Sequence, residues 1–136
     1  MDFTVEDVGT LIREIEKEVR GKAAKSLVAE GLTVPQYSVL SQLSRTPMAS
    51  NADIARAVSV TPQTTILIVQ NLLKRELIAR HHTEGRRVIA TTLTDQGARL
   101  LTQADGHVSA ARKEVFARIT AEEMASLVTI LRKLKS

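Results

Sequence analysis

The sequence predicts a mainly α fold (α+β), in which helices surround one β-hairpin in the order α-α-α-α-β-β-α-α. Apolar residues recur at helical spacing at both ends of the chain, and Ser50 and Thr61 offer two helix starts a few residues apart. Two segments rich in β-branched residues, 78–80 and 88–93, flank a polar turn that contains Gly85. Because no Gly/Pro/Ser-rich linker divides the 136 residues, we expect a single domain over 1–136.

The first two helices follow from periodicity and from capping signals. The periodic apolar residues predict a long helix from about Val5 to about Glu30, which is stopped by Gly31, a residue suited to a helix end. Thr33 and Gln36 then form a capping box, in which each side chain binds a free backbone amide of the helix start. This second helix ends before Pro47.

Two short helices follow in close succession. Ser50 and Asp53 form the capping box of the third helix. Thr61 caps the fourth, and Pro62 suits the first helical position because its missing N–H would be unpaired there anyway. This spacing is typical of a helix-turn-helix, whose second helix normally lies in the DNA major groove. The hairpin after it makes the motif a winged helix-turn-helix.

Two helices complete the chain. Thr94 caps a long fifth helix, and Thr120 with Glu123 forms the capping box of the sixth. Small or apolar residues recur along the fifth helix at alternating spacings of four and three: Gly97, Leu101, Ala104, Val108, Ala111 and Val115. Such a seam usually packs against another helix. We interpret it as a dimer surface, with burial inside one chain as the alternative.

Composition narrows the class of function. The net charge is +4, and the basic residues gather on the predicted winged helix-turn-helix, which favours an anionic partner such as double-stranded DNA. The chain has no Cys, which excludes disulfides and thiolate metal sites, and its few aromatic residues argue against stacking on single strands. No apolar run is long enough to cross a membrane, and the acidic start does not resemble a signal peptide, so we expect no membrane partner and a cytoplasmic location.

The fourth helix carries the candidate base contacts. Its buried face is predicted to hold Thr65, Ile68, Val69 and Leu72, which leaves Gln63, Thr64 and Gln70 pointing outward. A glutamine can form two hydrogen bonds with adenine. A threonine can form a hydrogen bond through its hydroxyl or contact a thymine methyl. Solvated polar caps are the alternative interpretation, but the neighbouring hairpin favours contact with DNA.

Basic residues around this helix are candidate backbone contacts. We expect the phosphates to be bound by Thr61, Lys74, Arg75 and Arg80. Arg86 and Arg87 lie at the tip of the hairpin, where either guanidinium can enter a narrow minor groove.

The sequence gives little support for a metal site or for an enzyme active site. His81 and His82 are adjacent in a strand and point to opposite faces, so they are poorly placed to hold one metal ion. No Gly-rich phosphate loop and no set of nucleophile, base and orienting residue is recognisable. We therefore predict no enzyme activity, no catalytic residues, no metal and no cofactor.

The element order, LTVPQYSVL at 32–40, the helix-turn-helix and LTDQG at 93–97 together resemble the multiple antibiotic resistance regulator (MarR) family. The resemblance implies a homodimeric transcriptional repressor that binds pseudo-palindromic DNA. It implies dimerisation helices at 1–31 and 95–136 and a DNA-binding part at 33–94. It also implies release of DNA by a small, often phenolic, effector. Ile12, Ile15 and Tyr37 are candidates for its cleft, although we favour core packing for them.

The sequence departs from the family pattern in three places. The wing is about one residue longer before Leu93, which leaves open whether Arg86 or Arg87 is the minor-groove arginine. Glu76 stands where the family often has Gly at the end of the recognition helix. Two apolar residues, Ile66 and Leu67, occupy positions that are commonly polar or basic, which predicts weaker phosphate binding or more contact with thymine methyls.

Three hypotheses of function follow from these observations. The first is a sequence-specific repressor that occupies promoter DNA as a homodimer. The second is an architectural protein that coats DNA, which predicts steep salt dependence with little sequence preference. The third is a winged-helix module that binds another protein and retards no duplex.

Overall fold

The computed structural model describes residues 2–82, 85 and 89–135. Its elements follow the predicted order, with a short 3₁₀ turn (Val28–Glu30) after the first helix. The helices are α1 (Val5–Leu27), α2 (Val34–Arg45), α3 (Asn51–Val58), α4 (Pro62–Lys74), α5 (Asp95–Phe116) and α6 (Ala121–Lys135), and the strands are β1 (Ile78–His82) and β2 (Ile89–Leu93).

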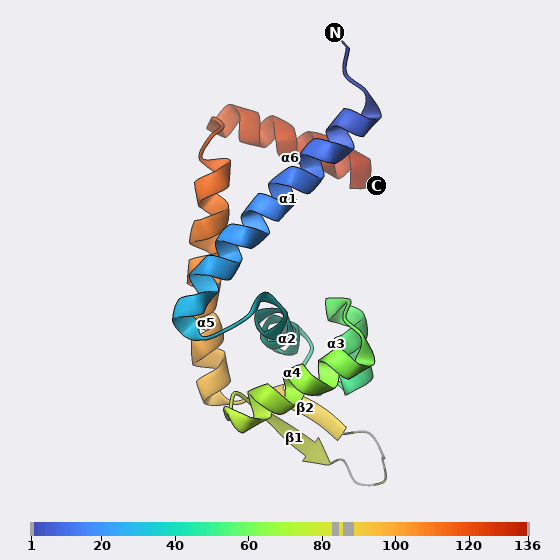
Figure 1. Ribbon diagram of the computed structural model, residues 1–136, viewed down its shortest axis with the longest axis vertical. Helices are drawn as coiled ribbons and strands as arrows, with labels where there is room; N and C mark the ends of the chain where they lie inside the picture. The colour runs from blue at the N-terminus through green and yellow to red at the C-terminus, as the bar shows by residue number, and fades with distance from the viewer. Residues whose placement is uncertain (1, 83–84, 86–88, 136) are drawn as a thin grey trace.

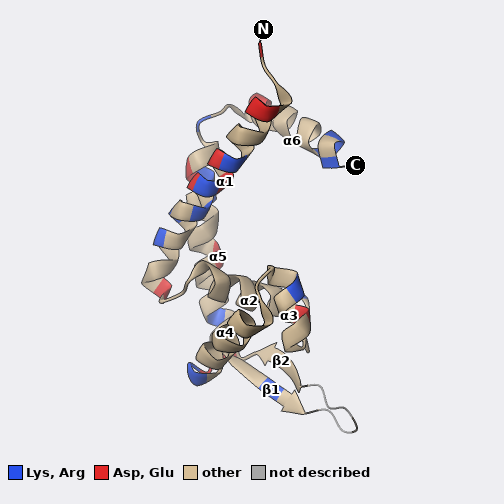
Figure 2. Cartoon of the chain, turned by 45° about the vertical axis from the view of Figure 1, so that its right-hand side comes forward, with Lys and Arg blue, Asp and Glu red and all other residues tan. Residues whose placement is uncertain are grey.

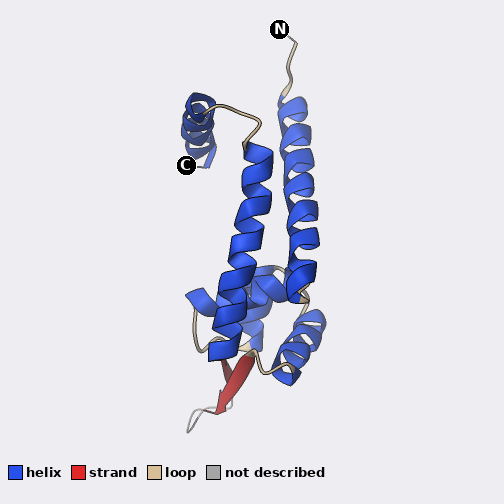
Figure 3. Ribbon diagram, turned by 90° about the vertical axis from the view of Figure 1, so that its left-hand side faces the viewer, coloured by secondary structure: helices blue, strands red, loops and turns tan. Residues whose placement is uncertain are grey.

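The chain has an elongated shape with a compact head at one end. Helices α2, α3 and α4 and the two strands form the head, from which α1 and α5 extend (Figure 1). These two long helices lie side by side, as Figure 3 shows, and α6 turns back from α5 at the end far from the head. The head therefore corresponds to the predicted winged helix-turn-helix and the stalk to the predicted terminal helices.

The predicted helix starts are confirmed by their capping hydrogen bonds. Capping boxes form at Thr33, Ser50 and Thr120, where each hydroxyl accepts from the amide three residues on. Thr61 Oγ1 accepts from the Thr64 amide at 3.1 Å, with Pro62 at the first helical position. A further capping box at Thr4 fixes the start of α1 and was not predicted.

Among the described residues, three helix ends have the same left-handed turn, one with glycine and two without. Ser59, after α3, has φ 55, and the Val60 amide donates to Ala55 O. Gly31 has φ 66, and its turn is closed by hydrogen bonds from Gly31 N to Val28 O and from Leu32 N to Leu27 O. Glu76 has φ 60 at the corresponding place after α4, where the Leu77 amide donates to Leu72 O. The left-handed turn that glycine usually forms at a helix end is thus present, although Glu76 departs from the family pattern there.

The seam along α5 is buried within the single chain, so its interpretation as a dimer surface is wrong. All six seam residues, from Gly97 to Val115, are buried, and α1 packs along α5. Gly97 has no room for a side chain, because a Cβ added there would lie 1.9 Å from Leu77 O. Small residues in the seam allow close packing within one chain, which was the alternative interpretation.

Polar contacts along the stalk hold α1 and α5 together. Lys22 Nζ lies 3.1 Å from Glu114 Oε1, and Arg118 binds Glu18 with both terminal nitrogens. The hydrogen bonds from Arg118 lower the pKa of Glu18 below its ordinary value. These pairs are exposed to solvent, so they orient the helices more than they stabilise them.

The strands form the predicted antiparallel hairpin. Ile78 pairs with Leu93 and His82 with Ile89. Ala49, just before α3, adds an isolated bridge to Thr91, whose amide donates to Ala49 O at 2.9 Å. This bridge was not predicted, and it joins the middle of β2 to the start of the helix-turn-helix.

Candidate nucleic-acid interface

Helix α4 presents one buried face to the head and one polar face to solvent. Thr65, Ile68, Val69 and Leu72 are buried, as predicted. Thr65 also donates a hydrogen bond from its hydroxyl to Thr61 O at 3.0 Å, which satisfies the only polar group of this face. The helix therefore cannot rotate without exposing its apolar stripe, and its outward residues are fixed in direction.

The predicted base contacts lie on the outward face. Gln63, Thr64 and Gln70 are all exposed. Thr64 is partly committed to the helix cap, because its hydroxyl accepts from Thr61 Oγ1 at 2.9 Å. The structure thus brings the two glutamines and the first turn of α4 onto one accessible surface, as a major-groove reader requires.

Sequence reasoning missed a polar contact that positions α4. Gln36 Nε2 donates to Asn71 Oδ1 at 3.0 Å, which connects the start of α2 to the middle of α4. The two residues are far apart in the chain, and nothing local in the sequence indicates that they meet.

The predicted phosphate contacts differ in their surroundings. Lys74 is exposed at the end of α4 and Arg80 is exposed on β1. Figure 2 shows basic residues at this end of the head and acidic residues at the start of α1, at the other end of the molecule. Arg75 instead turns toward the stalk, where its guanidinium donates to Gly31 O at 2.8 Å and to Glu30 O at 3.4 Å.

The remaining predicted contacts belong to the segment between the two strands. Arg86 and Arg87 lie outside the described residues. Gly85 has φ 75, the left-handed conformation that a tight turn needs. On the strands below, His81 Nε2 lies 2.7 Å from Thr92 Oγ1, a cross-strand contact that supports the hairpin.

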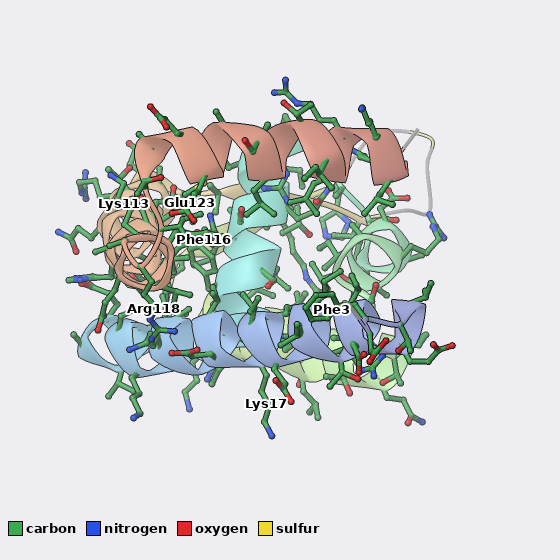
Figure 4. The ribbon with its side chains drawn as sticks, turned by 90° about the horizontal axis from the view of Figure 1, so that it is seen from above. Phe3, Lys17, Lys113, Phe116, Arg118 and Glu123 are labelled. Carbon is green, nitrogen blue, oxygen red and sulfur yellow. The ribbon has the colours of Figure 1, made fainter. Side chains whose placement is uncertain are left out.

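The three residues named for an effector cleft line two different hollows. Ile12 and Ile15 line one of about 430 Å³ between α1, α5 and α6, together with Phe116, Leu127 and Leu131. Phe116 lies between α6 and α1, whereas Lys17 extends from the opposite side of α1 (Figure 4). Ile12 and Ile15 remain 48% and 43% exposed, so the single chain does not bury them in its core.

Tyr37 lines the second hollow, of about 240 Å³, between α1, α2 and α5. Its hydroxyl donates to Asp105 Oδ1 and so connects the head to α5. Burial, followed by the hydrogen bond and the negative charge of Asp105, raises the pKa of Tyr37 from 10.0 to about 12. Arg20 and Arg112 line the same hollow with several apolar side chains, and Arg20 forms an ion pair there with Glu16.

Neither a metal site nor a membrane span is found within the described residues. These contain no cluster of three or more His, Asp or Glu side chains that could hold a metal ion. None of the helices built from them is sufficiently long and apolar to cross a bilayer. His107 contacts Glu30 Oε1 at 2.9 Å, which joins α5 to the turn after α1.

Comparison with known proteins identifies similar chains. The model of the MarR family matches residues 32–89. The HTH-type transcriptional repressor Rv2887 of Mycobacterium tuberculosis is 33% identical over 130 residues, which are 95% of this chain and 94% of that protein. The HTH-type transcriptional repressor MdtR of Bacillus subtilis is 30% identical over 138 residues, which cover 98% of this chain and 86% of that protein.

Solved structures of the mycobacterial protein are similar over almost the whole chain. Rv2887 in complex with DNA has a TM-score of 0.83 at 32% identity and covers 99% of this chain and 100% of that chain. Rv2887 in complex with p-aminosalicylic acid has a TM-score of 0.80 at 34% identity, over 94% of this chain and 98% of that chain.

Proposed function

This chain belongs to the MarR family of winged helix-turn-helix transcriptional regulators, and we propose that it represses transcription by binding pseudo-palindromic promoter DNA as a homodimer. The observation that carries the proposal is the outward face of α4, where exposed Gln63 and Gln70 stand on a helix whose opposite face is locked into the head. The complex of Rv2887 with DNA supports it. Two such helices in successive major grooves require centres about 34–36 Å apart.

Each group of polar residues has its own role in this proposal. Gln63, Thr64 and Gln70 contact base edges, and Arg86 or Arg87 enters the minor groove. The phosphates are bound by Thr61, Lys74, Arg75 and Arg80. For Arg75 this role requires release from the carbonyl groups of Glu30 and Gly31, so binding of DNA there would be coupled to the turn that joins the stalk to the head.

The proposed dimer uses the end of the stalk that lies far from the head, with residues from within 1–31 and 95–136. Large apolar side chains on the first half of α1 and on α6 are exposed in the single chain: Val5, Val8, Leu11, Ile12, Ile15, Val128, Ile130, Leu131 and Leu134. An apolar surface this extended usually marks an interface between chains. A second copy would cover it and would close the hollow between α1, α5 and α6.

We place the effector site in the hollow beside Tyr37. Rv2887 has been solved with p-aminosalicylic acid, a small aromatic acid, which supports a ligand of that chemistry here. Its carboxylate would pair with Arg112, since Arg20 already pairs with Glu16, and its ring would contact the apolar side chains of the lining. Because Tyr37 joins α2 to α5, an occupant there would change the spacing of the two DNA-binding heads.

The test combines mass measurement in solution with binding to genomic DNA fragments at two salt concentrations. The proposal requires a dimer that retains a preference for particular fragments at the higher salt concentration. Equal affinity for all fragments with a steep salt dependence would instead identify an architectural protein. Failure to retard any duplex would identify a protein-binding module.

This role needs no catalysis and no cofactor. The named relatives are repressors, and the proposed contacts use only hydrogen bonds, ion pairs and apolar packing. We place the protein in the cytoplasm, because the chromosome of the bacteria that carry these relatives lies there.

A further inference from the structure

The outward face of α4 carries an apolar residue, Leu67, within its polar stripe. Gln63, Leu67, Gln70 and Lys74 recur at spacings of four, three and four residues, so they form a single stripe. Leu67 lies in the middle of that stripe and is 67% exposed. Its neighbour Ile66 lies toward the edge of the face and is 43% exposed.

The fold gives no reason for a leucine at this position. The apolar face of α4 lies on the opposite side of the helix and is complete, with Ile68, Val69 and Leu72 buried. An exposed leucine gains little from the hydrophobic effect, whereas burial of the same side chain in a complex removes its apolar surface from water. The placement of Leu67 therefore indicates a contact made outside the single chain.

The chemistry of the major groove leaves one partner for such a side chain. Base pairs present hydrogen-bond donors and acceptors there, and the C5-methyl group of thymine is the only apolar group. Leu67 lies between Gln63 and Gln70, which are the proposed base contacts. Because Leu67 is continuous with the proposed DNA surface, we take its partner to be DNA. This inference rests on the proposed function.

We propose that Leu67 reads the C5-methyl group of one thymine in each half-site of the operator. The thymine lies between the base pairs approached by Gln63 and Gln70. Because each glutamine suits adenine, the centre of each half-site is rich in A·T pairs. Leu67 forms no ion pair or hydrogen bond with DNA, so this position contributes sequence preference and adds nothing to the salt dependence of binding.

The experiment removes single methyl groups from the DNA. A duplex is first selected by the wild-type protein from a random-sequence pool, and each thymine of that duplex is then replaced in turn by deoxyuridine, which differs only in lacking the methyl. Binding is measured at one salt concentration for the wild type, Leu67→Ala and Ile66→Ala. Because both variants truncate an exposed apolar residue, Ile66→Ala is the matched control.

We expect one thymine per half-site at which deoxyuridine weakens wild-type binding about fourfold, the value for one buried methyl group. At that position Leu67→Ala should bind the two duplexes equally, whereas Ile66→Ala should keep the fourfold difference. Thermal unfolding of both variants checks that the head remains folded.

The two ways of failing are distinguishable. If no sequence is enriched from the pool, the proposed function fails and the role of Leu67 fails with it. If a sequence is enriched but the penalty for deoxyuridine is the same in the wild type and in Leu67→Ala, the proposed function stands and the role of Leu67 is overturned. A penalty lost in Ile66→Ala and kept in Leu67→Ala also overturns it.

Discussion

Replacing Glu76 with glycine should stabilise the protein. Glu76 follows α4 with φ 60, a conformation that brings the Cβ of an L-residue close to its own backbone. Gly31 occupies the same kind of turn after α1 with φ 66 and avoids this strain. Gly31 and Glu76 thus occupy equivalent helix ends, and only Gly31 is the residue that suits this conformation.

The size of the effect follows from two opposing contributions. The left-handed conformation costs a residue with a Cβ roughly 1–2 kcal/mol. Glycine loses more backbone freedom on folding, which offsets about 0.5–1 kcal/mol of that gain. We therefore expect the free energy of unfolding to rise by about 0.5–1 kcal/mol for Glu76→Gly, the difference between these two contributions.

Urea unfolding of the full chain measures this difference. Protein concentration must be held constant, because dissociation of a dimer contributes to the apparent stability. Glu76→Ala is the matched control, since it removes the carboxylate and keeps the strained Cβ, and it should gain nothing. The reciprocal change Gly31→Ala should lower stability by about 1 kcal/mol or more, because it adds a Cβ where φ is positive.

The order of the urea midpoints of the glycine and alanine variants tests whether Glu76 is strained. Backbone strain at Glu76 requires the glycine variant to unfold at a higher urea concentration than the alanine variant, with an unchanged dependence of the free energy on denaturant. A midpoint for Glu76→Gly at or below that of Glu76→Ala would refute the reasoning.

Three further predictions concern packing, titration and DNA. Gly97→Ala should lower stability by roughly 3 kcal/mol, at the upper end for overpacking, because its Cβ meets a backbone carbonyl; wild-type resistance to urea would contradict this. Tyr37 is the only Tyr and the chain has no Trp, so a pH titration followed by near-ultraviolet absorbance should give its pKa as about 12. The midpoint of this titration should be lower in Asp105→Asn. The stabilisation linked to this raised pKa is present below pH 10 and declines toward pH 12, because the unfolded chain ionises first. Gln63→Ala should relax preference at one base pair, whereas Lys74→Ala should weaken all duplexes and reduce the salt slope by about 1; equal effects of both on cognate and random DNA would refute these roles.

The elements that could be predicted are those specified by neighbours in the sequence. A capping box needs two residues three positions apart. Such boxes begin at Thr33, Ser50 and Thr120. The buried face of α4 follows from the helical repeat alone, because burial of an apolar stripe is what keeps such a helix in place. The head was therefore predictable almost element by element.

The contacts that escaped prediction join residues far apart in the chain. Tyr37 binds Asp105, and Arg75 binds the carbonyl groups of the turn at Gly31. The sequence marked Arg75 only as a basic residue at a helix end, which is also what a phosphate contact looks like. Charge and position predict which residues can bind an anion, but the partner a guanidinium has in the free protein depends on tertiary structure.

The seam on α5 shows that the sequence also does not indicate which chain supplies a packing partner. Alternating spacings of four and three indicate that a helix packs against another, and they do not indicate whether that helix belongs to the same chain. Here α1 supplies the partner and buries Ala104 and Val108 within one copy. The surfaces left uncovered lie at the other end of the stalk, where Val5 is 84% and Leu134 69% exposed. Dimerisation through these ends leaves the packing of α1 on α5 unchanged, so each copy can keep its head fixed to its own stalk while a second copy sets the distance between the two heads.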